Sequence, residues 1–400
     1  MKPARLAIVT THPIQYYAPL FRVLAADPRL SVRVFYTWSQ TEAGPVPDRD
    51  FAREIRWDIP LLDGYEYEFV PNVAERPGSD HFRGILNPGL IPAIERWGAD
   101  AVLIFAWNLA SHLGAMRYFK GRLGVYFRGD STLLDPRPGW RRVLRRLALT
   151  WVYRHIDVAL AVGSANCDYY RWCGVADSRI VLAPHAVDNE RFIDALGEAD
   201  ADAEALRLRG RFGIPANALV FLFAAKFIPK KDPLSLLAAF KELASPAHLV
   251  FVGNGPLEHE LRSAAAGHPQ IHFIDAQNQR AMPAIYRVGD VFVLPSSGPG
   301  ETWGLAINEA MASGRCVIAG SRAGGARDLI RPGTDGWLFE SGNRASLLAA
   351  LRRAEDCGCD RLRTMGVAAR EHVASWSIPD TAQRIAAAVT RRAVAPPRQA

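Results

Sequence analysis

Short, nearly continuous apolar runs alternate with amphipathic stretches along the chain. The runs in the first half occupy 5–11, 31–37, 100–106, 123–129, 157–163 and 179–184. Those in the second half occupy 218–225, 248–253, 271–275, 290–296 and 315–320. Runs of this length and β-branched content are typical of buried parallel strands, and the stretches between them have helical patterning. The sequence therefore predicts an α/β fold with two doubly wound halves, each a parallel sheet covered by helices on both faces.

A charged, Ala- and Gly-rich segment separates the two halves. We predict an N-terminal Rossmann-like domain over 1–190, a linker over 191–215, a second Rossmann-like domain over 216–375 and a last helical segment over 376–400. In paired domains of this kind, ligands bind at the carboxyl ends of the strands. The sequence therefore predicts that the functional residues follow the apolar runs.

The composition is that of a globular protein with a basic surface. Of the 400 residues, 49% are hydrophobic and 22% charged, and no run approaches the ~18 apolar residues of a membrane span. The first apolar run is interpreted as a buried strand and not as a signal peptide. Five cysteines without a C-x-x-C pair favour reduced, cytoplasmic thiols over a zinc site or a disulfide framework. The net charge of +7 suits anionic partners such as nucleotides, but an ordinary basic protein carries the same charge.

The stretch ETWGLAINEAMASG at 301–314 places two glutamates around the start of an apolar helix. Glu301 lies in the loop after a predicted strand, whereas Glu309 lies in the early turns of the helix that Gly304 opens. Unpaired N–H groups at the helix start, near Gly304 and Leu305, can bind an anion that glycine allows to approach closely. Since a carboxylate accepts two hydrogen bonds, each glutamate suits adjacent sugar hydroxyls. The stretch therefore suits a phosphate held between two hydroxyl-bearing rings, as in a sugar nucleotide.

Two lysines follow the first strand of the second half. Lys226 is at the end of that strand, and Lys231 is at the junction of the following loop and helix. Lysines at such positions can act as point charges on a diphosphate and can neutralise a leaving group. A solvated lysine loop is the alternative, but the presence of the glutamate pair favours the diphosphate.

These motifs resemble those of the retaining glycosyltransferases of family 4, which have the GT-B fold. The pattern E-x7-E stands before an apolar helix, and the basic pair follows the first strand of the same domain. Further stretches also look like the family pattern, namely LVFVGNGPLEHEL, IHFIDAQNQRAMPAIYRVGDVFVLPSS, GGARDLIRPGTDGWLF and APHAVDNERF. The resemblance is dense over 218–345 and mostly architectural over 1–190. It implies that the final helix, 377–395, crosses back onto the first domain.

The resemblance also implies a reaction and a set of residue roles. A hexosyl group would pass, with retention, from a nucleotide-sugar donor to a hydroxyl of a glycan or lipid-linked glycan in cell-surface polysaccharide synthesis. Neither a metal nor a cofactor is expected. Glu309 would bind the ribose hydroxyls, Glu301 the donor sugar and the two lysines the diphosphate, while Asn278 would lie near the base. The donor-binding set that the resemblance implies is Lys226, Lys231, Asn278, Glu301, Gly304, Leu305 and Glu309.

Candidate acceptor contacts lie at a strand end in the first half. Where the family often has a Gly-Gly loop after its first strand, this chain has His12, Pro13 and Ile14, at the start of a helix predicted over 13–26. His12 and Gln15 are therefore candidates for contact with the acceptor. For His12 the alternative is a strand-end histidine bonded to the backbone.

A second group of candidates follows the run 123–129. Arg128 is another candidate for contact with the acceptor. Asp130 could orient or deprotonate the acceptor hydroxyl, or it could simply cap the following turn. Together with Asp130, the residues expected to take part in catalysis are Glu301 and Lys231. In a retaining transfer the leaving diphosphate can itself assist the proton of the acceptor, so a strong protein base is unnecessary.

Other functions fit parts of the sequence less well. GNGPLE at 253–258 has Glu258 in place of the third glycine of a dinucleotide site, which argues against NAD. A D-x-D pair at 48–50 resembles a metal site but lies in a Pro-rich loop. A glycosidase also needs two carboxylates, but hydrolysis does not require paired lysines. The alternative function is a GT-B-type sugar-nucleotide epimerase, or a non-catalytic protein that binds nucleotide sugars or a membrane surface.

The stretch 137–155 predicts a basic, amphipathic helix. Its arginines on one side are Arg141, Arg142, Arg145 and Arg146, and its apolar stripe on another side is Leu144, Leu147 and Trp151. Such a helix suits an anionic membrane surface, with the protein peripheral at the inner face and a lipid-linked glycan as the acceptor. No recognition motif supports nucleic-acid binding. The alternative is a surface helix that docks its apolar stripe onto the first domain.

Overall fold

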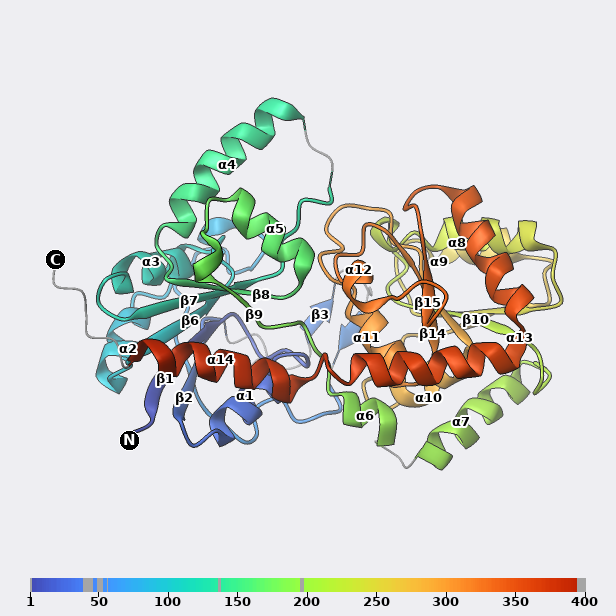
Figure 1. Cartoon of the computed structure of the whole chain (residues 1–400), viewed down its shortest axis with the longest axis horizontal. Helices are drawn as coiled ribbons and strands as arrows, with labels where there is room; N and C mark the ends of the chain where they lie inside the picture. The colour runs from blue at the N-terminus through green and yellow to red at the C-terminus, as the bar shows by residue number, and fades with distance from the viewer. Residues whose placement is uncertain are drawn as a thin grey trace. The chain divides into compact units, whose positions relative to one another are not determined.

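The computed structural model describes residues 2–38, 46–48, 53–55, 57–135, 138–194 and 198–393. The chain forms two compact units (Figure 1). Unit 1 comprises Met1–Val46, Pro60–His185 and Ile378–Ala400, and unit 2 comprises Pro47–Ile59 and Ala186–Ser377. Among the described residues, no helix is both long and apolar enough to span a bilayer.

Unit 1 is built on a seven-stranded parallel sheet with the order β5-β2-β1-β6-β7-β8-β9. Its strands are β1 (Ala4–Thr10), β2 (Leu30–Tyr36), β5 (Glu66–Phe69), β6 (Ala101–Phe105), β7 (Gly124–Gly129), β8 (Val158–Ala161) and β9 (Ile180–Leu182). Its helical elements are α1 (Ala18–Ala26), η1 (Phe82–Gly84), α2 (Leu90–Trp97), α3 (Ala110–Phe119), α4 (Gly139–Tyr153), α5 (Ser164–Trp172), η2 (Asp177–Arg179) and α14 (Ile378–Ala393). The central strands are continuous apolar runs because helices cover both faces, and every residue of β6 is buried.

Helix α1 begins five residues later than predicted. Ile14 accepts hydrogen bonds from the backbone N–H groups of Tyr17 and Ala18, both at 3.0 Å, and closes a turn before the helix. Pro19 then stands in the first turn of the helix, where its missing N–H costs nothing. A helix beginning at Pro13 would have placed Pro19 in its interior, where proline breaks the hydrogen-bond ladder.

The C-terminal helix α14 packs on unit 1, which confirms the crossing that the resemblance implied. Tyr126 of β7 donates its hydroxyl to the carbonyl of Ala388 at 3.0 Å. Thr381 donates its hydroxyl to the carbonyl of Pro184 at 2.9 Å. The helix also lies along α1. These contacts join α14 to β7 and to the segment that follows β9.

Unit 2 is built on a six-stranded parallel sheet with the order β12-β11-β10-β13-β14-β15. Its strands are β10 (Val220–Ala224), β11 (His248–Val252), β12 (Ile271–Ile274), β13 (Val291–Leu294), β14 (Cys316–Gly320) and β15 (Gly336–Phe339). Its helical elements are α6 (Asn189–Asp194), α7 (Glu198–Arg211), η3 (Pro229–Lys231), α8 (Pro233–Leu243), α9 (Glu258–Ala265), α10 (Met282–Val288), α11 (Leu305–Ala312), α12 (Ala326–Leu329) and α13 (Arg344–Val373). Two further strands, β3 (Val46–Asp48) and β4 (Arg53–Ile55), form a separate pair.

The strand order of unit 2 reverses beside β10. This strand pairs with β11 on one side and with β13 on the other, where Phe221 is in register with Val291. At such a reversal the chain leaves the two neighbouring strands toward opposite faces of the sheet, and ligands bind at the carboxyl ends of these strands. The loops after β10 and β13 are those that contain the predicted lysines and Glu301.

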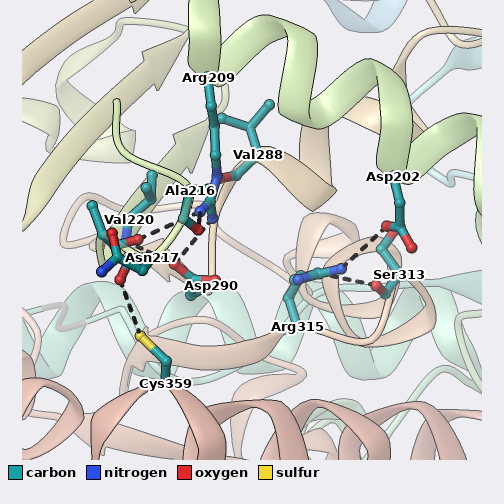
Figure 2. Close-up of polar contacts among 11 residues, drawn as sticks. Asp202, Arg209, Ala216, Asn217, Val220, Val288, Asp290, Ser313, Arg315 and Cys359 are labelled. Carbon is teal, nitrogen blue, oxygen red and sulfur yellow. Dashed lines mark hydrogen bonds and ion pairs between the residues drawn. The ribbon is translucent and has the colours of Figure 1, made fainter. Parts of the chain in front are cut away.

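The segment predicted as a linker, 191–215, is largely helical and belongs to unit 2. Figure 2 shows how α7 is held: Arg209 donates from Nε to the carbonyl of Val288 at 2.8 Å and lies 3.0 Å from Oδ2 of Asp290. From the same helix, Asp202 lies 3.8 Å from a guanidinium nitrogen of Arg315. Polar contacts to the starts of β13 and β14 hold this helix, and its apolar face is narrow. Its sequence is therefore rich in charge and resembled that of a linker.

Candidate functional site

The loops that follow β10 and β13 lie against each other at the reversal of strand order in unit 2. The carbonyl of Lys230 accepts hydrogen bonds from the N–H groups of Ser297 and Gly298, both at 3.3 Å. Lys230 also donates from Nζ to the carbonyl of Gly300 at 3.1 Å. A Cβ atom at Gly298 would lie 2.6 Å from Cα of Lys230, so only glycine permits this approach. The two loops are therefore held as one unit of structure.

This contact brings together Lys231 and Glu301, two residues predicted to take part in catalysis. Nζ of Lys231 lies 2.6 Å from Oε2 of Glu301, and the two side chains are 16% and 6% exposed. Ser296 donates its hydroxyl to the same oxygen at 3.0 Å. Asp232 follows in the left-handed region (φ 53°, ψ 46°), and its carboxylate accepts the N–H of Ser235 at the start of α8. A tight turn thus directs Lys231 toward the end of β13.

The electrostatics of this pair favour an anion. Burial alone would raise the pKa of Glu301, but the charge and hydrogen bond of Lys231, with smaller contributions from Lys230 and Ser296, lower it. Burial lowers the pKa of Lys231; Glu301 opposes this change, and repulsion from Lys230 and Lys226 adds to it. Lys231 and Lys230 therefore act on one carboxylate that stays ionised, and Lys226 adds positive charge near Lys231. An anion beside the lysines would relieve their repulsion.

Gly304 shapes the start of α11 as the sequence predicted. Its backbone is left-handed (φ 93°, ψ 58°), and a Cβ atom would lie 2.9 Å from Cδ2 of Leu294. Its carbonyl accepts the N–H of Ile307 at 2.8 Å. Leu305 is the first helical residue and is half-buried. By the geometry of a helix, the first N–H groups have no partner inside the helix, and here they follow Glu301 in the chain.

Glu309 lies deeper than its predicted contact with a ribose suggests. Its side chain, in the second turn of α11, is only 4% exposed. Tyr286 of α10 donates its hydroxyl to Oε2 of Glu309 at 2.6 Å. Tyr286 was not among the predicted residues, although the family-like stretch that contains it was. An aromatic residue in an apolar helix gave no signal that its hydroxyl would reach a carboxylate.

A glycine pair after β14 supports the loop that contains Glu301. Gly324 donates its N–H to the carbonyl of Glu301 at 3.1 Å, and Gly325 donates to the carbonyl of Trp303 at 2.9 Å. A Cβ atom at Gly325 would lie 2.7 Å from the indole ring of Trp303. The indole N–H in turn donates to Oδ1 of Asn308 at 2.8 Å. The family-like Gly-Gly turn therefore fixes the backbone on both sides of Thr302.

Asn278 follows a strand that is not next to the strands preceding Lys231 and Glu301. It follows β12, an edge strand that β11 separates from β10, and its Oδ1 accepts the N–H of Gln279 at 2.8 Å. Beside it lies a cavity of about 720 Å³ between α7 and α10. The lining includes Gln277 and Arg280 but neither Lys231 nor Glu301. We place the site at the pair because buried ionised groups converge there.

In unit 1, Arg128 is buried against the backbone. It is 3% exposed, and its guanidinium donates to the carbonyl oxygens of Ala183 and, at 3.0 Å, Pro184. Burial lowers its pKa, which Tyr17 and other neighbours partly offset. The guanidinium therefore holds the backbone that directly follows β9 in place. This position makes Arg128 a positioning residue more than the direct acceptor contact that we predicted.

The other candidates of unit 1 lie at strand ends as predicted. His12 contacts the hydroxyl of Thr11 through Nδ1 at 3.0 Å, and burial lowers its pKa. Gln15 is half-buried in the turn before α1. Asp130 is half-buried just after β7. Burial, together with the charge of Asp130, raises the pKa of Tyr17 to about 12, so these two side chains are neighbours.

The described residues contain no cluster of three or more His, Cys, Asp or Glu side chains that could hold a metal ion. Of the D-x-D pair, Asp48 ends β3, and Arg49 and Asp50 lie outside the described residues.

Comparison with known proteins agrees with this geometry. Residues 206–372 match the family of Glycosyl transferases group 1. Over 208 residues the chain is 30% identical to the sulfoquinovosyl transferase SQD2 of Arabidopsis thaliana, a match that covers 51% of this chain and 39% of that protein. Over 188 residues it is 30% identical to the UDP-Gal:alpha-D-GlcNAc-diphosphoundecaprenol alpha-1,3-galactosyltransferase of Escherichia coli, covering 44% and 46%. These matches span less than half the length of either relative.

The fold extends the similarity to both units. The structure of HepE from Anabaena in complex with UDP and glucose superimposes with a TM-score of 0.71 at 18% identity, covering 97% of this chain and 100% of that one. At this identity the likeness concerns the fold. The chain therefore has the GT-B fold, and residues 206–372 are similar to the group 1 glycosyltransferases, in agreement with the resemblance found in the sequence.

Proposed function

We propose that the protein is a retaining glycosyltransferase that moves a hexosyl group from a nucleotide-sugar donor to a hydroxyl of a glycan. The observation that carries this proposal is the buried ion pair of Lys231 and Glu301 at the strand reversal of unit 2, where the positive charges of Lys230 and Lys226 also act on Lys231. A diphosphate supplies the negative charge that this cluster lacks. The carboxylate of Glu301, bonded to Lys231 and Ser296, keeps further acceptor capacity for sugar hydroxyls.

In this proposal each of the predicted site residues of unit 2 has a role in binding the donor. The lysines hold the diphosphate and stabilise the charge that develops on the leaving oxygen. Glu301, oriented by Lys231 and Ser296, binds hydroxyls of the donor sugar, and Glu309 binds the ribose. N–H groups of Gly304 and Leu305 contact a phosphate, and Asn278 lies toward the base. No role is assigned to a metal ion.

The reaction breaks the bond from the anomeric carbon to the diphosphate and forms a bond to the acceptor oxygen on the same face. The acceptor's proton passes to the leaving phosphate oxygen, so the charges balance without a strong protein base. Asp130 orients the acceptor hydroxyl, with His12 and Gln15 as further acceptor contacts and Arg128 holding the local backbone. These residues of unit 1 bind neutral groups, which suits a sugar.

We further propose that the acceptor is a lipid-linked glycan in cell-surface polysaccharide synthesis, reached by a cytoplasmic protein that is peripheral at the inner face of the membrane. The name of the Escherichia coli relative describes transfer to a diphosphoundecaprenol-linked sugar, and SQD2 is by name a sulfoquinovosyl transferase. The first name supports the acceptor class, and the second supports the transfer of a sugar group.

The first test is calorimetric titration with UDP, GDP, ADP and CMP, with a chelator present, of the wild type and Lys231→Met. We expect one nucleoside diphosphate to bind, and the variant to bind it about 10- to 100-fold more weakly, because a charge-assisted hydrogen bond contributes about 1.5–3 kcal/mol. The matched control is Lys241→Met, since Lys241 is an exposed residue of α8 whose Nζ donates only to the carbonyl of Ala264. Equal weakening by both variants, or no binding to the wild type, would contradict the proposal.

The matching nucleotide sugar then separates the alternatives. NMR of the product measures the configuration at the anomeric carbon of the transferred sugar. Transfer to a glycan with this configuration unchanged supports a retaining transferase. Release of an epimerised sugar nucleotide instead supports the epimerase. Binding without turnover on any acceptor supports a non-catalytic protein.

A further inference from the structure

Helix α4 carries an apolar stripe that unit 1 does not cover. Among the described residues, the side chains of its stripe are exposed as follows: Trp140 63%, Val143 59%, Leu144 59%, Leu147 65% and Trp151 41%. The spacing of four, three and four residues from Trp140 to Trp151 places them along one side of a helix. The other large exposed apolar side chains in the described part of the chain are dispersed over six different positions. The stripe is therefore a continuous apolar surface and not a scatter of single residues.

The opposite side of α4 makes the contact with unit 1. Its buried residues are Leu149, Val152 and Tyr153, all near the C-terminal end of the helix. Arg146 faces the same way, because its Nε donates to the carbonyl of Trp172 at 3.0 Å. Figure 1 shows the N-terminal part of the helix projecting away from the sheet of unit 1. The alternative predicted from the sequence, that the stripe docks onto the first domain, is therefore wrong.

Positive charge lies at both ends of the stripe. Residues 138–155 contain five arginines and no acidic residue. At one end of the stripe the guanidinium of Arg141 lies 5.1 Å from the ring of Trp140, and at the other end that of Arg117 lies 5.5 Å from the ring of Trp151. Tryptophan rings prefer the boundary between apolar and aqueous phases, and arginine there binds phosphate. The two ends of the stripe thus combine an interfacial aromatic ring with a cation.

We propose that α4 lies flat on an anionic membrane surface, with its apolar stripe inserted at the boundary between headgroups and acyl chains. The helix of 15 residues is about 22 Å long, which is too short to span a bilayer but suits a position in its plane. A second copy of the chain is a poorer occupant, because two such helices would bring ten arginines together without an acidic residue. The charge of the helix matches lipid phosphates.

Membrane binding by α4 deepens the proposed function, because a lipid-linked acceptor lies at the membrane. Only this reason for the binding rests on the proposed function. The stripe and its arginines lie in unit 1, and the donor-binding residues lie in unit 2. Membrane binding and nucleotide binding can therefore be measured separately, and each can fail without the other.

The test is flotation with vesicles of phosphatidylcholine, with and without phosphatidylglycerol, and with no glycan acceptor present. The wild type is expected to float with the anionic vesicles and much less with the neutral ones. Leu144→Glu/Leu147→Glu is expected to reduce binding about a hundredfold, because it removes two apolar side chains that insertion into the membrane buries. The control Leu206→Glu/Val367→Glu changes two equally exposed leucine and valine positions on other helices and should float like the wild type. Raising salt from about 0.1 M to about 1 M should weaken binding by screening the arginines.

Nucleotide titration of each variant shows that unit 2 is intact and that any loss of flotation belongs to α4. Flotation of the Leu144→Glu/Leu147→Glu protein at the wild-type level would overturn the proposal. So would equal binding to neutral and anionic vesicles, which would remove the role of the arginines. A dimer in solution that the same substitutions dissociate would instead identify a second copy as the occupant and overturn the membrane assignment.

Discussion

The two units share one architecture, but the buried cations at the carboxyl ends of their strands have different partners. In unit 2, Lys231 pairs with Glu301 at 2.6 Å, and two more lysines repel it. In unit 1, Arg128 is more deeply buried and donates to two backbone carbonyl oxygens. An ion pair that feels the charge of two further lysines gains from a bound polyanion, whereas a cation bonded to the backbone mainly holds the chain in place. The contrast favours the proposed binding of the charged donor by unit 2.

Buried histidines add to the neutral character of unit 1. His112 is fully buried; its Nδ1 donates to the carbonyl of Phe105 at 2.6 Å, and its Nε2 lies 2.8 Å from the hydroxyl of Thr37. Burial lowers the pKa of His112 to about 4, although its hydrogen bonds to backbone carbonyls oppose the change. Burial and the neighbouring arginine lower the pKa of His185 well below its usual value. Neutral imidazoles therefore line the interior near these strand ends.

The largest expected effect comes from breaking the ion pair of unit 2 on one side. Lys231→Met leaves Glu301 buried and ionised without its partner. We expect the free energy of unfolding to fall by about 3–5 kcal/mol, the usual cost of an uncompensated buried charge. Denaturant titration measures the change. Lys231→Met/Glu301→Gln removes both charges and should recover most of the lost stability without restoring nucleotide binding.

This double-variant comparison decides whether the pair serves binding or folding. If the double variant is as unstable as Lys231→Met, the lysine stabilises unit 2 through contacts other than Glu301. If the double variant binds nucleotide like the wild type, the pair has no part in donor binding.

A smaller effect is expected from the cation of unit 1. Arg128→Met removes two hydrogen bonds to the carbonyls of Ala183 and Pro184 but leaves no carboxylate stranded. The expected loss is about 1–3 kcal/mol, because the removed desolvation cost of the guanidinium offsets part of the loss. Arg128→Lys keeps the charge but cannot reach both carbonyls from one planar group, so it should rescue little. Full rescue by lysine would show that charge, and not the geometry of the guanidinium, stabilises this part of unit 1.

The sequence predicted the part of the site that depends on strand ends. Polar residues after two parallel strands of one sheet had to lie at the same edge, so Lys231 and Glu301 could be expected close together. The place of Gly304 directly before α11 followed from a glycine at a predicted helix start. Neither inference needed the packing of side chains over long distances.

What the sequence could not predict depends on tertiary contacts. The periodicity of α4 showed an apolar stripe but not whether the protein would cover it. The charge of α7 concealed a helix because its anchor, Asp290, is far away in the sequence from Arg209. The buried hydroxyl of Tyr286 reaches Glu309 only because α10 and α11 pack together. For α7 and Tyr286 a contact between residues distant in the sequence decided the outcome, and for α4 the absence of such a contact decided it.

The smallest expected effect is a dependence of stability on pH that arises in unit 1. The folded-state pKa of His112, about 4, lies below its usual value of 6.5. Between these values the unfolded chain binds a proton that the folded protein does not. Stability from this group is therefore present above pH 6.5 and is lost as the pH falls toward 4. Between pH 6.5 and 5.5 we expect His112 to lower the free energy of unfolding by about 1 kcal/mol.

Glu301 behaves differently, because its pKa is lowered from 4.5 and its contribution is lost only below that pH. Denaturant titrations of His112→Gln at several pH values should therefore show a shallower slope than the wild type between pH 6.5 and 5.5. His259→Gln, at an exposed position of α9, is the matched control and should leave the slope unchanged. An unchanged slope in His112→Gln would mean that the buried imidazole takes up its proton in the folded state. Unit 1 would then resemble unit 2 in holding charge near its strand ends, and the contrast between the units would rest on Arg128 alone.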